Sequence, residues 1–346
     1  MPMLSVNNSF KKFILFYVRH WGQLSHVKSI LRELNDCHFI ISSHSIDEKD
    51  FYSHEVSRLD NAIWVDDHDL ILSKISSFDI LMTFDSLLVK GHKACLNVIE
   101  EARKFNLPIM ELQHGLFQVS INAFHQPTVN KFFDESLVVR SAATHRLTWF
   151  ETPDGINIGY PIFDGRTIPR PQNFSKPIVS IFTNLHWKAR SRGNRVKILF
   201  DILNFIKNHP NIHFFWKRHH GELCDINTIE DVNNVENLIG QQMTEFDNLV
   251  LVDNETEPSR LLEFSTHAIS TISTVLLDIE MYHVECAVIA DEETINLLDV
   301  FDTFTIFNSD MSLDNFKELR SGMLFPFNPK ILRKTVMEPH GRRDLA

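Results

Sequence analysis

The chain has 346 residues, a length that predicts two domains rather than a single core. Its formal net charge of −11 argues against a general nucleic-acid binder, and 43% hydrophobic with 23% charged residues is usual for a globular protein. The apolar run at 13–18 is too short for a membrane span or a signal peptide, so we expect a strand there and a cytoplasmic protein. The four cysteines form no closely spaced pair, which argues against disulfides and a zinc site.

The first half of the chain alternates short apolar runs with amphipathic stretches. Apolar runs separated by helical patterns indicate parallel strands with helices on both faces of a sheet. The expected strands are 13–18, 38–42, 79–85, 108–113, 136–140 and 156–161, and the expected helices are 23–34 and 91–105.

The same alternation restarts in the second half of the chain. The stretch 164–177 between the halves is rich in proline and polar residues, has no periodicity and predicts a linker. We therefore expect two doubly wound α/β domains, 1–165 and 176–325, and a tail, 326–346, that packs back on the first domain. The expected strands of the second half are 176–185, 212–217, 248–253, 266–271 and 285–291, with 301–307 as a further candidate, and the expected helices are 195–209 and 273–282.

Polar residues that follow strands of the second half form a candidate anion site. Ser273 and Thr274 open an expected helix, whose free backbone N–H groups favour a phosphate and whose hydroxyls add donors. The run KRHH, residues 217–220, follows a neighbouring strand and adds cationic and imidazole donors. Both features also occur without a ligand, because Ser-Thr pairs cap helices and Lys-Arg pairs lie in solvated turns. The basic run 188–195, which includes Arg190, is a candidate contact for donor phosphate or anionic lipid, or a solvated loop.

His114 is the candidate general base of the first half. It follows the expected strand 108–113, Gly115 lets the chain turn sharply there, and imidazole titrates near neutrality. A histidine in a turn is also common without any chemical role. Asp85 ends another apolar run and is the alternative base, unless it only caps the helix that follows.

Other polar side chains surround the same predicted strand ends. Arg19 and His20 follow the first strand, and Gln113 ends the strand before His114. Ligands of open α/β sheets bind beyond the carboxyl ends of the strands, so these three residues are candidate ligand contacts. Glu111 is the nearest alternative base, but it lies two residues back on its strand, where we expect it to point inward.

Four motifs occur in an order that resembles a known group of enzymes. They are LQHG (112–115), IGYPIFD (158–164), WKRHH (216–220) and STISTVLLDIE (270–280). Their order resembles that of GT-B glycosyltransferases and related transferases: the teichoic-acid and capsule glycerophosphate polymerases, and bacterial sialyl- and Kdo-transferases with cytidine-activated donors. In the first of these groups a Lys-x-His-Pro follows the strand, where this chain has His220 in place of proline, and Thr274 replaces the second serine.

The resemblance implies two Rossmann-like domains facing a central cleft. The first domain would bind the acceptor and the second the nucleotide donor. His219, Ser273 and Thr274 would contact the donor phosphate, and Asp278 or Glu280 the ribose. Lys217 and Arg190 would add positive charge, and His114 would be the base or would orient the acceptor.

We predict glycosyl transfer from a nucleotide-activated, cytidine-type donor to a hydroxyl of a surface-polysaccharide or lipid-linked glycan. No carboxylate pair of the DxD type follows a strand, and VDDHD (65–69) reads as a solvated loop, so we expect no metal and no cofactor besides the donor. The resemblance also implies peripheral contact with the inner face of the membrane. The alternatives are polyol-phosphate transfer from a CDP-glycerol-type donor, a nucleotide- or sugar-binding module without chemistry, and a nucleotide-sugar epimerase, for which no clear carboxylate pair stands out.

Overall fold

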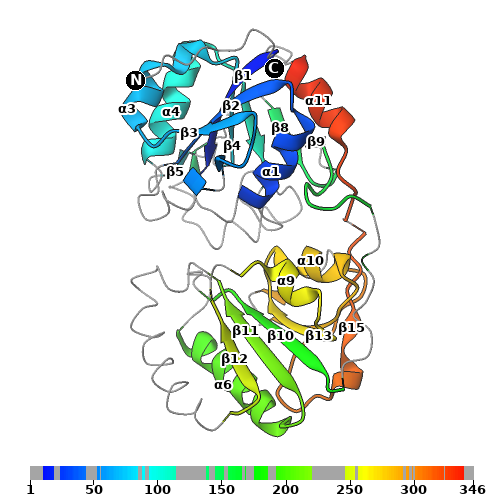
Figure 1. Ribbon diagram of the computed structural model, residues 1–346. Coiled ribbons are helices and arrows are strands. Elements are labelled where there is room, and N and C mark those ends of the chain that lie inside the picture. Colours follow the sequence, from blue (N-terminus) through cyan, green and yellow to red (C-terminus); the bar gives the residue numbers. More distant parts are fainter. Residues whose placement is uncertain are drawn as a thin grey trace.

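A computed structural model gives the fold of the chain, and two parallel sheets organise it, one in each half (Figure 1). The N-terminal half lies at the top of that view and the C-terminal half at the bottom. The structure describes residues 11–18, 24–43, 53–54, 56–84, 88–89, 93–113, 138–139, 145–151, 155–165, 168, 175–185, 192–219, 246–253, 256–290, 294–295, 298, 301–322 and 324–338.

Among the described residues, the N-terminal sheet has seven strands, and every neighbouring pair is parallel. The chain runs outward from β1 to one edge and then continues on the other side from β4, so the topological switch point lies between β1 and β4. In spatial order the strands are β3 (Ala62–Trp64), β2 (Cys37–Ser43), β1 (Lys12–Val18), β4 (Ile80–Thr83), β6 (Ile109–Leu112), β8 (His145–Thr148) and β9 (Ile156–Asn157).

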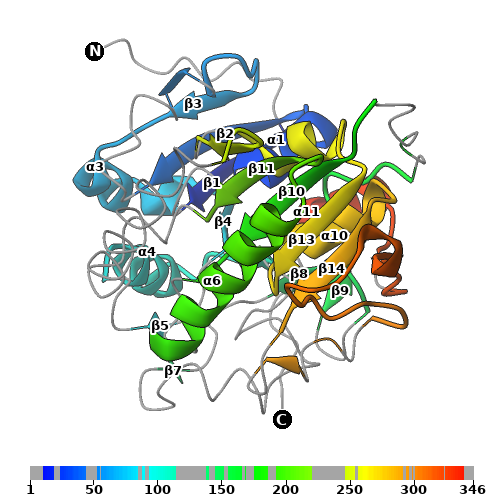
Figure 2. The same cartoon turned by 90° about the horizontal axis from the view of Figure 1, so that it is seen from below.

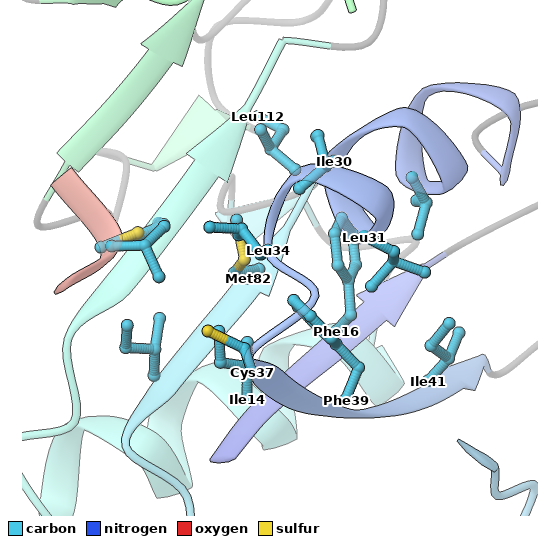
Figure 3. Packing of buried hydrophobic residues seen from close by; sticks show 14 of the residues in the cluster. Ile14, Phe16, Ile30, Leu31, Leu34, Cys37, Phe39, Ile41, Met82 and Leu112 are labelled. Carbon is cyan, nitrogen blue, oxygen red and sulfur yellow. The ribbon is translucent and has the colours of Figure 1, made fainter. Parts of the chain in front are cut away.

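Helices cover both faces of this sheet because its central strands are apolar on both sides. On one face, α1 (Leu24–Glu33) and α11 (Pro329–Met337) pack on the sheet. On the other face lie α3 (His68–Ser73) and α4 (Lys93–Lys104). Figure 3 shows part of the first core, where Ile30 and Leu31 of α1 lie near Phe16 and Phe39 of the strands.

The C-terminal sheet has six strands in the part of the chain that the structure describes, and it repeats the same winding. All pairs are parallel except the last, β14 with β15. The switch point lies between β10 and β13. In spatial order the strands are β12 (Leu249–Val252), β11 (His213–Arg218), β10 (Ile178–Thr183), β13 (His267–Thr271), β14 (Glu285–Ile289) and β15 (Lys317–Glu318).

The long helix α6 (Arg192–Asn208) covers one face of the C-terminal sheet, and it runs alongside β10 and β13 in Figure 2. The apolar stripe that predicts this helix is largely buried, and Phe205 is buried with it. The other face is covered by α9 (Pro258–Leu262) and α10 (Val275–Met281), which lie in the part of this half nearest the N-terminal half (Figure 1). The prediction of two doubly wound α/β sheets is confirmed.

One predicted strand lies outside the main sheet. Within 136–140, Val138–Val139 form the strand β7, which pairs antiparallel with β5 (Leu88–Val89) in a separate sheet. The place beside β6 belongs instead to β8, which begins with His145 and Arg146. Both side chains are polar and half-buried, so β8 lacks the continuous apolar run that is typical of a central strand. The candidate strand 301–307 contains only the isolated bridges at Thr303 and Ile306.

The helix α11 ends the described chain and lies on the N-terminal half, beside α1 (Figure 1). Asn328 caps it through a bond from the Ile331 N–H at 3.2 Å, and Pro329 occupies its first turn. Its Leu332 is fully buried in the core of the N-terminal sheet, whereas Ile331 remains 38% exposed.

We expect Leu332→Ala to lower the free energy of unfolding by about 2–5 kcal/mol, because it leaves a cavity in the N-terminal core. Ile331→Ala is the matched control on the exposed face of α11, and its cost should stay below about 1 kcal/mol. Urea denaturation of both variants measures the difference. Equal midpoints would show that α11 does not contribute its buried face to this core.

Candidate functional site

The switch point of the C-terminal sheet brings the ends of β10 and β13 together. The backbone N–H of Asn184, just beyond β10, donates to the Thr271 hydroxyl at the end of β13, at 2.7 Å. Thr183 also accepts a bond from the Trp216 indole at 3.1 Å. Side-chain hydroxyls therefore fix the backbone at the position where open α/β sheets bind their ligands.

The neighbouring strand β11 adds a cation to this edge. Lys217 is 8% exposed and alternates with Trp216, so it points to the face that α9 and α10 cover. The backbone N–H of His219 donates to the Thr183 carbonyl at 2.8 Å, which holds the residue after β11 against the end of β10, and the His219 side chain is exposed. The structure thus places Lys217 and His219 beside the switch point.

Ser273 and Thr274 link β13 to α10. The Ser273 hydroxyl accepts from the Val275 N–H at 3.3 Å, and the Ser273 and Thr274 carbonyls accept from Leu276 and Leu277. Both side chains are half-buried. The Ser273 hydroxyl therefore satisfies one N–H at the start of the helix, and both hydroxyls lie just beyond the end of β13.

Asp278 lies in a different environment from the other predicted donor residues. It is 8% exposed, and its Oδ1 accepts a hydrogen bond of 2.8 Å from the Tyr160 hydroxyl. Burial raises the pKa of Asp278 to about 7, the bond from Tyr160 opposes this rise, and Glu257 adds to it. The Glu280 oxygens accept from the Ser321 N–H at 2.9 Å and its hydroxyl at 2.5 Å. Both carboxylates hold neighbouring segments of the chain, and a contact with ribose remains a prediction.

The N-terminal side of the candidate site is described up to the strand ends. Gln113 is buried and its Oε1 accepts from the Trp149 N–H at 2.9 Å, so its amide joins the ends of β6 and β8. Glu111 points inward, as expected: it is fully buried on the face of β6 that α4 covers. Some predicted site residues lie outside the described part of the chain: Arg19, His20, Asp85, His114 and Arg190.

The run 65–69, predicted to be a solvated loop, is a loop only up to Asp67, because the helix α3 begins at His68. Asp67 caps it, and its Oδ1 accepts from the Leu70 N–H at 2.9 Å. In the described part of the chain, no group of three or more metal-ligating side chains comes together. No helix of that part is long and apolar enough to cross a bilayer.

Residues beyond the carboxyl end of β8 pack against the C-terminal half. Trp149 and Phe150 follow β8, and both are buried in the same apolar cluster as α10 of the second half. Tyr160 joins this cluster, with its ring centroid 4.7 Å from that of Trp149. Residues beyond β8 therefore contact the helix that follows β13.

Sequence reasoning missed Asn184, Thr271 and Tyr160 as structural partners at these strand ends. Threonine at the end of an apolar strand is a weak signal, because it favours strands for its branched side chain alone. Tyr160 lies in the Gly-Tyr-Pro motif, but the motif does not reveal that the hydroxyl reaches a carboxylate 118 residues further along the chain.

No protein-family model and no curated protein sequence matches the chain. Its fold is similar to that of the UDP-GlcNAc 2-epimerase from Methanocaldococcus jannaschii in complex with UDP-GlcNAc and UDP. The TM-score is 0.58 at 11% identity, over 94% of this chain and 98% of that chain. The α,α-trehalose-phosphate synthase (UDP-forming) from Burkholderia vietnamiensis has a TM-score of 0.51 at 10% identity, over 95% and 99%.

The fold is also similar to that of the wall teichoic acid polymerase TagF with CDPG. The TM-score is 0.51 at 12% identity, over 96% of this chain and 85% of that chain. At such low identities the comparisons establish the fold, and they agree with the sheet topology described above. The chain has the two-domain, Rossmann-like GT-B fold, and the predicted resemblance in fold to a teichoic acid polymerase is confirmed.

Proposed function

We propose that the protein is a metal-independent glycosyltransferase that moves a sugar from a nucleotide-activated, cytidine-type donor to a hydroxyl group. The observation that carries the proposal is the edge of the C-terminal sheet, where three strand ends are held together. The backbone N–H of Asn184 donates to the Thr271 hydroxyl, and that of His219 donates to the Thr183 carbonyl. Lys217 adds a cation at the same edge. Such an edge suits the phosphates of a nucleotide donor.

On the donor side, the residues would stabilise the leaving nucleotide. Lys217 and His219 would neutralise its phosphate charge, and the Ser273 and Thr274 hydroxyls would donate hydrogen bonds to its oxygens. Fixed donors and charges aimed at developing negative charge are a main source of rate in such reactions. Asp278 and Arg190 are the further donor contacts that the motifs suggest.

On the acceptor side, a base would take the proton of the attacking hydroxyl. The acceptor oxygen would form a bond to the anomeric carbon, the bond from that carbon to the donor phosphate would break, and His114 or Asp85 would receive the proton. Gln113, Arg19 and His20 would contact the acceptor. We propose a surface-polysaccharide or lipid-linked glycan as acceptor, with the basic run 188–195 touching the cytoplasmic face of the membrane.

Polyol-phosphate transfer from a CDP-glycerol-type donor is the second candidate function. The fold likeness to a teichoic acid polymerase solved with CDPG supports it. In this reaction the acceptor oxygen would attack phosphorus, and the cytidine monophosphate would leave. The same phosphate contacts would serve both reactions, so the product of a donor screen distinguishes them.

We expect Lys217→Gln to weaken the binding of CDP or UDP about tenfold or more, because a charge-assisted hydrogen bond contributes about 1.5–3 kcal/mol. Lys207→Gln, in the last turn of α6, is the matched control and should bind as the native protein does. Isothermal titration calorimetry measures both affinities. Unchanged affinity in Lys217→Gln would remove this lysine from the donor site.

A further inference from the structure

The chain passes between its two halves twice, and the two crossing segments pair with each other. The first crossing, residues 158–163, follows β9, and the second, residues 324–328, precedes α11 (Figure 1). The Tyr160 N–H donates to the Phe325 carbonyl at 2.9 Å, and the Asn328 N–H donates to the Ile158 carbonyl at 2.7 Å. Any change in the angle between the domains must bend this paired segment.

A carboxylate of α10 ties the helix to each crossing. Asp278 accepts the bond from Tyr160 in the first crossing, and Glu280 accepts two bonds from Ser321, just before the second. Residues two apart on a helix point to nearly opposite sides, since each residue turns the helix by about 100°. One short helix is therefore tied on one side to the first crossing and on the other to the residue Ser321, just before the second.

Among the described residues, no cation compensates the burial of the Asp278 carboxyl. Tyr160 faces it from the first crossing, Glu257 from the start of α9, and Tyr282 from the end of α10. Burial raises the pKa of Asp278 to about 7, with a further rise from Glu257. A buried acid without a cation lowers stability once it ionises, so packing alone gives no reason for it here.

We propose that Tyr160 and Ser321 are positioning residues that transmit the hinge angle between the domains to α10 and to the strand-end residues 271–274 before it. The link to the donor rests on the proposed function, whereas the tie between α10 and the crossings does not. Opening of the hinge would shift α10, and closure would set Ser273 and Thr274 in place for the donor.

Hydrogen–deuterium exchange of Tyr160→Phe tests the tie independently of any activity. The variant loses only the hydroxyl, and we expect exchange of the amides in 158–163, 275–281 and 325–328 to rise at least tenfold. Tyr282→Phe is the matched control, because it removes a buried phenol from the end of the same helix rather than from a crossing, and the bond between Tyr160 and Asp278 stays in place. Unchanged exchange in Tyr160→Phe, or an equal rise in both variants, would overturn the proposal.

The pH dependence of the same exchange supplies a second readout. The pKa of Asp278 is higher in the folded protein than in the unfolded chain, so its contribution to stability is present below about pH 4 and lost as the pH rises to about 7. After correction for intrinsic rates, we expect opening of these segments to increase at least tenfold from pH 5 to pH 8. Asp278→Asn keeps an acceptor for Tyr160, cannot ionise, and should abolish this increase. An unchanged pH profile in Asp278→Asn would contradict the assignment.

Steady-state kinetics tests the link to the donor. If the native protein transfers sugar, Tyr160→Phe should raise the donor KM at least fivefold and Tyr282→Phe should not. If Tyr160→Phe increases the exchange but leaves the donor KM normal, α10 is tied to the crossings but the tie does not affect donor binding. If the native protein transfers nothing, the proposed function fails, and exchange alone decides on the tie. Ser321→Ala tests the second crossing in the same way if Tyr160→Phe does not fold.

Discussion

His114→Ala is expected to lower the rate of transfer by a factor of about 10²–10⁴, the usual loss when a general base is removed. The acceptor hydroxyl would then have to lose its proton to water as it attacks. Binding of the nucleotide should stay within about twofold of the native value, because the donor contacts are proposed on the other domain. Single-turnover transfer and calorimetric titration of CDP on the same preparation measure the two effects.

Asp85→Asn separates the two candidate bases. If His114 takes the proton, Asp85→Asn should retain transfer within a few-fold. The rate of transfer by this variant should still fall at low pH, because a protonated imidazole cannot accept the proton. A loss of 10² or more in Asp85→Asn, together with near-normal transfer in His114→Ala, would assign the proton to the carboxylate instead.

Gly159→Ala is expected to cost about 3 kcal/mol or more of folding free energy. Gly159 has a φ of 73°, and an added Cβ would lie 2.0 Å from the Pro326 carbonyl oxygen. The neighbour is backbone of the second crossing, so the two crossings would have to separate and lose their hydrogen bonds. Urea denaturation measures the loss.

Gly322→Ala is the matched control for this prediction. Its φ is 61°, so it has the same left-handed backbone, but nothing lies within 4 Å of an added Cβ. Only backbone strain remains, which costs about 1–2 kcal/mol. Equal losses in the two variants would mean that the close approach of the crossings at Gly159 contributes nothing.

The architecture could be predicted from the sequence because central parallel strands are buried on both faces. The run 13–18 is apolar throughout and 178–183 is largely so, and their spacing by helical patterns indicates the winding of both domains. Strands nearer the sheet edges gave weaker signals. β8 begins with two half-buried polar side chains, and β3 has only three residues, so neither stood out.

The placement of the candidate donor residues could be predicted in part. Lys217 and His219 lie at the end of β11, and Ser273 and Thr274 lie just beyond β13, the strands on either side of β10, because the carboxyl ends of parallel strands lie along one edge. The environment of Asp278 could not be predicted. Its partner, Tyr160, belongs to the other half of the chain, and only the packing of the crossing against α10 brings the two together.

The most direct test of the proposed function is a donor screen with the purified native protein in the presence of EDTA. CMP-, CDP- and UDP-activated donors are mixed with a panel of glycan and polyol acceptors, and products and free nucleotide are read by mass spectrometry. Glycosyl transfer predicts an acceptor heavier by one sugar and an equal amount of released nucleotide. Nucleotide binding without any turnover, or an epimerised donor without released nucleotide, would contradict it.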